Sequence, residues 1–202
     1  YDEAINYFKK SLALRLELKD KTGIGACYGN LGIIADELEK PQEALEHYRL
    51  ALKYYQEADY QFGIASVNNN MGAAHASLGN HEEALKHHKI SLQIRKEIKD
   101  KRGLVSNYIN IGSIYIQIQK FPEARDYLNN ALSLAKELEI KNQIMLSYKV
   151  LSQLDSAENN FQYAYQNYKL FKIYEDSIMN NENEQKILRM QLQYDFDKKE
   201  DS

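Results

Sequence analysis

The chain has 202 residues, a formal net charge of −3 and one cysteine, Cys27. This small net charge excludes the strongly basic surface of a nucleic-acid-binding protein, and one cysteine excludes both a disulfide framework and a thiolate metal site. The small net charge means that we expect no nucleic-acid partner. No run of 18 apolar residues occurs, so we also expect no membrane insertion by this chain.

Small residues recur through the chain at one interval. Alanines are spaced 40 residues apart, and two sets of glycines keep the same interval: Ala4, Ala44, Ala84, Ala124 and Ala164; Gly32, Gly72 and Gly112; Gly23, Gly63 and Gly103. A fixed period of this size indicates stacked supersecondary units, each of which buries its apolar face on its neighbours. The sequence therefore predicts a solenoid with an extended binding surface.

Residues 1–19 correspond to the second helix of a unit without its first helix. We expect four residues to show an apolar face to water there: Ala4, Ile5, Phe8 and Leu12. Because a native terminus normally carries a polar cap, we infer that more repeats precede this segment in the parent protein. The exposed face is one candidate surface for self-association.

The unit at about 23–58 shows how each repeat folds. Its first half carries an apolar stripe at helical spacing, formed by Tyr28, Leu31, Gly32 and Ala35. Pro41 opens a second helix, whose stripe consists of Ala44, Leu45, Tyr48, Ala51 and Leu52. We interpret the small Gly32 and Ala44 as points where two helix backbones approach closely. Units at about 63–98, 103–138 and 143–178 follow the same pattern, which predicts an all-α, right-handed α-solenoid of stacked antiparallel helical hairpins.

The first helices should line the concave side, where an asparagine recurs at the repeat interval as Asn30, Asn70 and Asn110. A carboxamide offers the donors and the acceptor that an extended peptide backbone requires, although each asparagine could instead orient the neighbouring helix. Both roles stay open. The same face supplies further candidate partner-binding residues: Ser66, Asn69, Ala73, Ser113, Gln117, Lys149 and Gln153. We expect a protein or peptide ligand across the first three units, with most room beside the small residues of the second.

Motifs for catalysis are missing from the sequence. There is no glycine-rich phosphate loop, nucleophile elbow or HExxH motif. We therefore predict no catalytic residues, no cofactor and no metal site. Four histidines fall in one unit, and His75 could approach His88 across the hairpin. However, His47 and His87 share one repeat position, which favours surface and packing roles.

The last second helix is rich in aromatic residues between Phe161 and Tyr174, and we expect them to pack against a following element. Residues 179–202 form a predicted C-terminal helical extension. Within it, residues 188–197 alternate apolar and polar, which alone favours a strand. The helix-forming composition and the spacing of Leu188, Leu192 and Phe196 instead favour a projecting helix.

The pattern Tyr28-x2-Leu31-Gly32-x2-Ala35, followed by Ala44-x3-Tyr48, resembles the tetratricopeptide (TPR) repeat signature. The 40-residue unit exceeds the usual length of about 34 residues and lengthens the second helix. This long variety is similar to Pins-type spindle adaptors, kinesin light chains and many bacterial signalling proteins. The resemblance covers residues 1–178. It implies a non-catalytic TPR-like superhelix, whose recurring asparagine contacts the main chain of a partner.

A second resemblance lies in the tail. The run Tyr174-x-Asp176-Ser177-Ile178, with the Tyr, Phe and Lys residues that follow, is similar to a junction in Bacteroidetes-type signalling proteins. There, TPR repeats precede a membrane segment and then a histidine kinase or transcription-regulator output domain. This implies the periplasmic sensory region of a two-component-type protein anchored in the inner membrane. The alternative is a cytoplasmic scaffold adaptor without an output domain. Self-association through the C-terminal helix is a further expectation.

Overall fold

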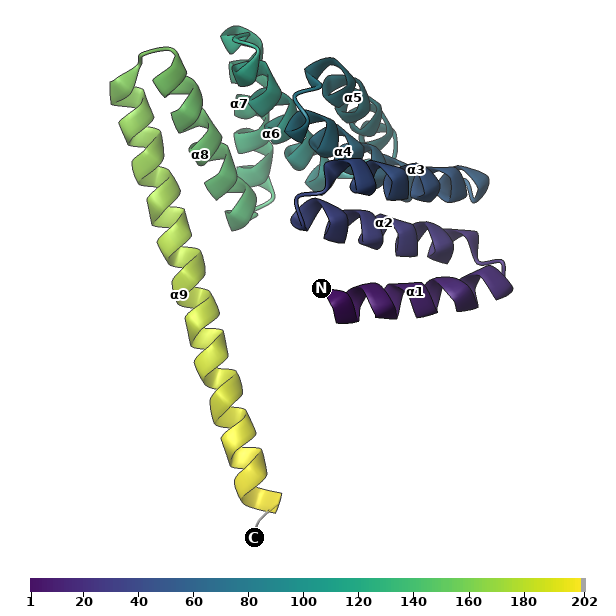
Figure 1. Cartoon of the computed structure of the whole chain (residues 1–202). Helices are drawn as coiled ribbons and strands as arrows, with labels where there is room; N and C mark the ends of the chain where they lie inside the picture. Colours follow the sequence, from purple (N-terminus) through teal and green to yellow (C-terminus); the bar gives the residue numbers. More distant parts are fainter. Residues whose placement is uncertain (201–202) are drawn as a thin grey trace.

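The computed structural model describes the backbone of residues 1–200, and their side chains except at positions 182, 187 and 191–200. Within this range the chain is helical, with no strand, and successive helices run antiparallel in a curved stack (Figure 1). The predicted α-solenoid of helical hairpins is therefore confirmed. The helices are α1 (Asp2–Glu17), α2 (Lys21–Glu37), α3 (Pro41–Glu57), α4 (Gln61–Ser77), α5 (His81–Glu97), α6 (Lys101–Gln117), α7 (Phe121–Glu137), α8 (Lys141–Ala157) and α9 (Phe161–Glu200).

Identical three-residue turns produce the repeat interval. The middle residue of each turn is left-handed, and it is a glycine only at Gly79 (φ 74°). After α2, for example, the Lys40 amide donates to the Ala35 carbonyl at 2.9 Å and the Glu39 amide to the Asp36 carbonyl at 2.9 Å. Such bonds satisfy the last carbonyls of a helix. A 17-residue helix and this turn make 20 residues, so a hairpin repeats every 40.

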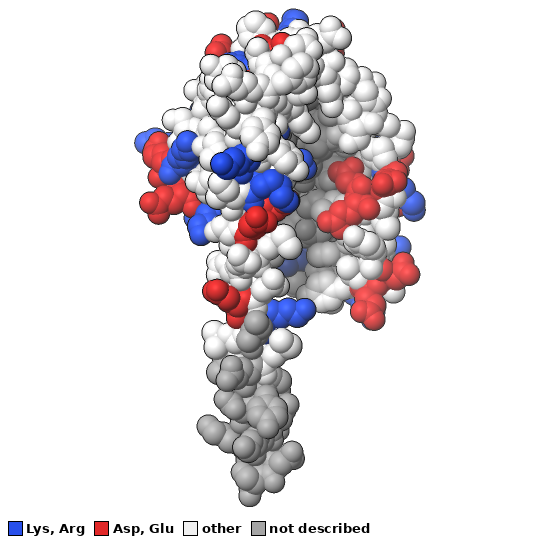
Figure 2. Space-filling model, turned by 90° about the vertical axis from the view of Figure 1, so that its left-hand side faces the viewer, with Lys and Arg blue, Asp and Glu red and all other residues white. Residues whose placement is uncertain are grey.

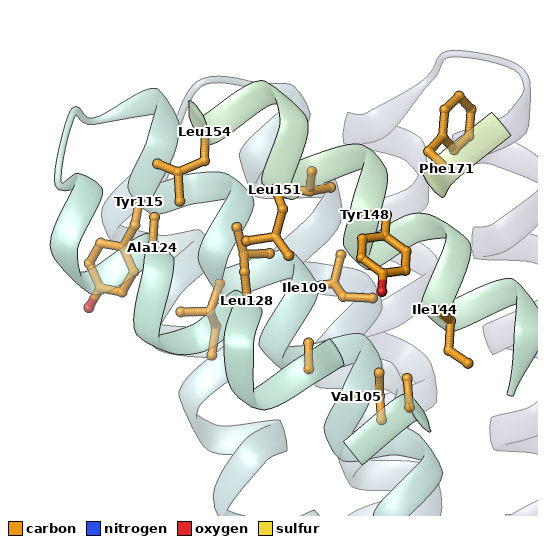
Figure 3. Close-up of a cluster of buried hydrophobic side chains, with 14 of the residues drawn as sticks. Val105, Ile109, Tyr115, Ala124, Leu128, Ile144, Tyr148, Leu151, Leu154 and Phe171 are labelled. Carbon is orange, nitrogen blue, oxygen red and sulfur yellow. The ribbon is translucent and has the colours of Figure 1, made fainter. Parts of the chain in front are cut away.

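The core between the hairpins consists of two apolar clusters. In the larger cluster, from α5 to α9, Leu128, Leu151 and Leu154 interdigitate with the aromatic rings of Tyr115 and Tyr148 (Figure 3). A second cluster joins α2, α3 and α4 around Tyr48. The repeat alanines of α3, α5 and α7 are completely buried. Burial of these stripes, and not helix propensity, holds the stack together.

The repeated glycines differ from the prediction in what they accommodate. A Cβ atom added to Gly32, Gly72 or Gly112 would collide first with the side chain sixteen residues later, and at Gly112 a backbone atom, the Ala124 carbonyl oxygen, also lies at 3.4 Å. The glycines therefore make room mainly for side chains and less for a bare backbone. The pairs are Gly32 with Tyr48, Gly72 with His88, and Gly112 with Leu128.

The N-terminal helix turns a different face to water than predicted. Ala4, Ile5, Phe8 and Leu12 are half-buried because α1 packs on α2 with this side. The exposed apolar residues are instead at other positions: Tyr1, Tyr7, Leu14, Leu16 and Leu18.

The C-terminal segment is a helix, not a strand, and α9 extends well beyond the stack (Figure 1). The predicted boundary at residues 178 and 179 falls inside this helix. The side chains of Leu192 and Phe196 lie outside the described residues. Phe171 and Tyr174 pack into the core, but against the preceding helix α8 and not against a following element as predicted. The other rings are exposed because, within residues 1–200, no further helix covers that side of α9: Phe161, Tyr163, Tyr165 and Tyr168.

Candidate functional site

A hollow of about 240 Å³ lies between α2 and α4, the first helices of two successive hairpins. We call it the inner hollow. It brings together three of the predicted partner-binding residues, Asn30, Ser66 and Asn70. Its complete lining is Ala26, Gly29, Asn30, Ile33, Tyr55, Ser66, Val67 and Asn70.

The inner hollow has an uncharged, mixed surface. Ile33 and Val67 provide apolar wall, while the carboxamides of Asn30 and Asn70 are half-buried. Tyr55 is only 9% exposed, and burial raises the pKa of its phenol, so the hydroxyl stays protonated at neutral pH. Such a surface can hold an apolar side chain while amide and hydroxyl groups pair with a main chain.

A second hollow of about 360 Å³ lies at the carboxyl-terminal end of α2 and is lined by Asp36, Glu39, Pro41, Ala73, Ala74 and Ser77. We call it the acidic hollow. The Tyr48 hydroxyl donates to Asp36 Oδ2 at 2.6 Å. Burial raises the pKa of Asp36, and this hydrogen bond opposes the rise. Figure 2 shows that one face of the array is hollowed and that Asp and Glu side chains gather along part of its rim.

The third predicted asparagine has a different environment. Asn110 Nδ2 donates to Asn69 Oδ1 at 3.2 Å, so these two amides bridge α4 and α6. This is the alternative role, in which asparagine orients neighbouring helices. Ser113 Oγ donates to the Ile109 carbonyl at 2.9 Å, and Gln117 is exposed. Ile109, next to Asn110, is only 7% exposed because it packs into the core beside α8.

The fourth unit stands apart from both hollows. Lys149 and Gln153 are exposed on α8, and Lys149 Nζ lies 5.8 Å from the centre of the Phe171 ring. Because α4 and α6 separate α8 from α2, these two residues do not join Asn30 and Asn70. A partner-binding role for them stays a prediction.

Sequence reasoning missed the part that second helices play in the site. Tyr55 of α3 reaches the inner hollow, and Tyr48 of the same helix reaches Asp36. One signal was present in the sequence. Gly25 and Gly29 stand one helical turn apart in α2, and a Cβ at Gly25 would collide with the Tyr55 ring. The missing side chains leave the space that the ring and the hollow occupy.

The histidines pair differently than expected. His75 stacks on His87, with ring centres 5.4 Å apart and an interplanar angle of 5°, and not on His88. His87 Nδ1 is 2.9 Å from Asn68 Oδ1, whereas His88 is buried beneath Gly72. Burial is the main cause that lowers the pKa of all three imidazoles. In the part of the chain that the structure describes, no three His, Cys, Asp or Glu residues are placed to hold a metal ion.

None of the helices in the described range is long and apolar enough to span a bilayer.

Comparison with known proteins gives a family match. The family model described as "Tetratricopeptide repeat" matches residues 1–57 and 63–137. No curated protein sequence matches the chain.

Several solved structures are similar in fold. BtubC (BKLC) from P. vanneervenii has 20% sequence identity and a TM-score of 0.74, over 85% of this chain and 71% of that chain. Aspartyl phosphate phosphatase F from Bacillus subtilis has 16% identity and a TM-score of 0.77, over 86% and 46%. A Rap protein complexed with Competence and Sporulation Factor has 15% identity and a TM-score of 0.67, over 87% and 59%. Our chain thus spans about half the length of the last two proteins, and these likenesses show the fold alone.

Proposed function

Because the chain belongs to the tetratricopeptide repeat family, we propose that it is a non-catalytic module that binds a protein or peptide in its concave groove. Stacked repeats of this kind create extended surfaces that suit linear ligands. The observation that carries the proposal is the inner hollow, an open and uncharged space with two half-buried carboxamides on facing helices.

The chemistry of the hollow suggests how a ligand binds. An extended peptide places one apolar side chain between Ile33 and Val67, and its main-chain groups pair with Asn30 and Asn70. The Rap protein of similar fold is complexed with Competence and Sporulation Factor, which supports a ligand-binding use of such an array.

The wider role that we propose is sensory. In this reading the module belongs to a bacterial two-component-type signalling protein, anchored in the inner membrane, with the array in the periplasm and an output domain after it. The continuity of α9 from the last hairpin to Glu200 supports a relay, because a shift of the hairpin is carried along a single helix. The alternative is a cytoplasmic scaffold adaptor. A parent gene that continues after Ser202 into about 20 apolar residues and a kinase domain favours the sensor, whereas further repeats favour the adaptor.

The binding proposal can be tested by filling the inner hollow. A Cβ at Gly29 meets nothing nearer than the Tyr55 hydroxyl oxygen, at 3.9 Å, and Gly29 lines the inner hollow, so Gly29→Leu adds a side chain to this space. The matched control, Glu46→Leu, adds the same side chain at an exposed position of α3.

Ten-residue peptides selected from a random phage library against the whole chain serve as probes, with affinity measured by fluorescence anisotropy. We expect Gly29→Leu to weaken binding by about tenfold or more, the equivalent of about 1.4 kcal/mol. Asn70→Ala should weaken the same peptides, and the control should not. If the selection yields no peptide, or only peptides that bind Gly29→Leu as well as the original chain, the groove is not the binding site.

A further inference from the structure

Three repeat positions at the carboxyl-terminal end of the first helix carry carboxylates in the first unit only. Positions 36, 37 and 39 of the first unit are Asp, Glu and Glu. None of the corresponding positions in the next three units is acidic; they hold Ala76, Ser77 and Gly79, then Ile116, Gln117 and Gln119, then Ser156, Ala157 and Asn159. The repeat fold therefore does not require negative charge at this place.

Helix stability does not explain these carboxylates either. Asp36 and Glu37 stand in the last turn of α2, which contains no basic residue. Negative charge there opposes the helix dipole, so each of these carboxylates destabilises the helix. Two other acidic residues at helix ends pair with a lysine of the same hairpin, Glu57 with Lys21 at 3.2 Å and Glu137 with Lys101 at 2.6 Å.

The carboxylates that line the acidic hollow have no such partner. Among the residues that the structure describes, neither Asp36 nor Glu39 forms an ion pair, and Lys40 beside them contacts Glu43 at 3.4 Å. Asp36 accepts only the neutral Tyr48 hydroxyl. Burial raises its pKa, and a cation brought to the hollow relieves this unfavourable environment.

The two hollows lie along the same seam between α2 and α4. Asn30 and Asp36 mark them on α2, and six residues of helix separate these positions by about 9 Å. A polyproline II segment has three residues per turn and a rise of about 3.1 Å, so its residues i and i+3 lie on one side about 9 Å apart. One extended peptide can therefore reach both hollows.

We infer that the groove binds an extended cationic peptide, with an apolar side chain in the inner hollow and a Lys or Arg three residues away in the acidic hollow. The alkyl stem of the basic residue packs on Pro41, Ala73 and Ala74, while its charged group pairs with Asp36 and Glu39. This inference rests on the proposed function and specifies the class of its ligand.

The test uses fluorescein-labelled nine-residue probes of Gly and Ser that carry one Leu and, three residues later, either Lys or Glu. Anisotropy measures their affinity for the whole chain and for the double variant Asp36→Asn, Glu39→Gln. Asparagine at position 36 keeps an oxygen that can accept the Tyr48 hydroxyl. Glu46→Gln, which removes an exposed carboxylate of α3, is the control.

We expect the Lys probe to bind about tenfold more tightly than the Glu probe at low salt, because the two carboxylates attract the lysine and repel the glutamate. The preference should fall below about threefold in the double variant and at high ionic strength, and should persist in Glu46→Gln. Equal binding of both probes, or a preference that the double variant retains, overturns the cationic inference. If Gly29→Leu still abolishes binding in that case, the proposed function stands. If no probe binds, the Leu–Lys motif is wrong, whatever the phage selection shows.

Discussion

The junction between α5 and α6 offers a sharp test of the packing argument. Arg95 is 8% exposed; its Nε donates to Ser91 Oγ at 3.2 Å and its Nη1 to Asp100 Oδ2 at 3.1 Å. Asp100 also caps α6 by accepting the Gly103 amide at 3.0 Å. A Cβ at Gly103 would lie inside the Arg95 guanidinium, so Gly103→Ala has to expel the arginine.

The expected cost follows from these contacts. Hydrogen bonds to charged groups contribute about 1.5–3 kcal/mol each, and Arg95 makes two of them. Solvation of the displaced guanidinium and the better helix propensity of alanine, about 1 kcal/mol, offset part of the loss. We therefore expect Gly103→Ala to lower the free energy of unfolding by about 2–3 kcal/mol. Gly29→Ala, whose Cβ meets nothing nearer than the Tyr55 hydroxyl oxygen at 3.9 Å, should raise it by about 0.5–1 kcal/mol.

Urea denaturation followed by far-ultraviolet circular dichroism measures both variants. Because repeat arrays can unfold unit by unit, the curves need a nearest-neighbour analysis. Gly23→Ala provides a graded comparison, because the corresponding pair of Arg15 with Asp20 is about 40% exposed and should cost less when broken. A Gly103→Ala protein as stable as Gly29→Ala would refute the argument.

Two further predictions concern the second unit and the first seam. Burial lowers the pKa of His88 to about 4, so the unfolded chain, with a pKa near 6.5, takes up the proton first. The free energy of unfolding should therefore fall by up to about 3 kcal/mol between pH 7 and pH 4. His88→Leu, which places at this position the leucine found at position 128, should reduce this pH dependence. If the variant keeps the pH profile of the original chain, the prediction is wrong. Gly29→Asn would place asparagines at positions 29 and 70 of the first seam, as Asn69 and Asn110 are placed at the second. It should close the inner hollow and weaken peptide binding without loss of stability, and unaffected binding would show that no bridge forms.

The 40-residue interval was sufficient to predict the hairpins because every unit uses the same turn and the same helix length. It could not predict which side chains meet across a hairpin. The stacking of His75 on His87, and not on His88, depends on a rotation of the helix that spacing alone leaves open. The chemistry of the junctions was equally hidden. Ser91, Arg95 and Asp100 correspond to Ser11, Arg15 and Asp20, which lie 80 positions earlier. The junction between these two, after α3, has Tyr55 in place of the arginine.

One pair of positions explains how the three seams between first helices differ. Where α2 meets α4 the pair is Gly29 and Asn70, and the inner hollow remains. Where α4 meets α6 the corresponding Asn69 and Asn110 join by a hydrogen bond. Where α6 meets α8 the residues are Ile109 and Val150, and both are buried in the same apolar cluster. A seam is thus hollow, bridged or sealed according to two side chains, because the backbone repeats while these positions vary. The asparagine that recurs in three units consequently has two roles, a free amide beside glycine and a helix-bridging amide beside a second asparagine.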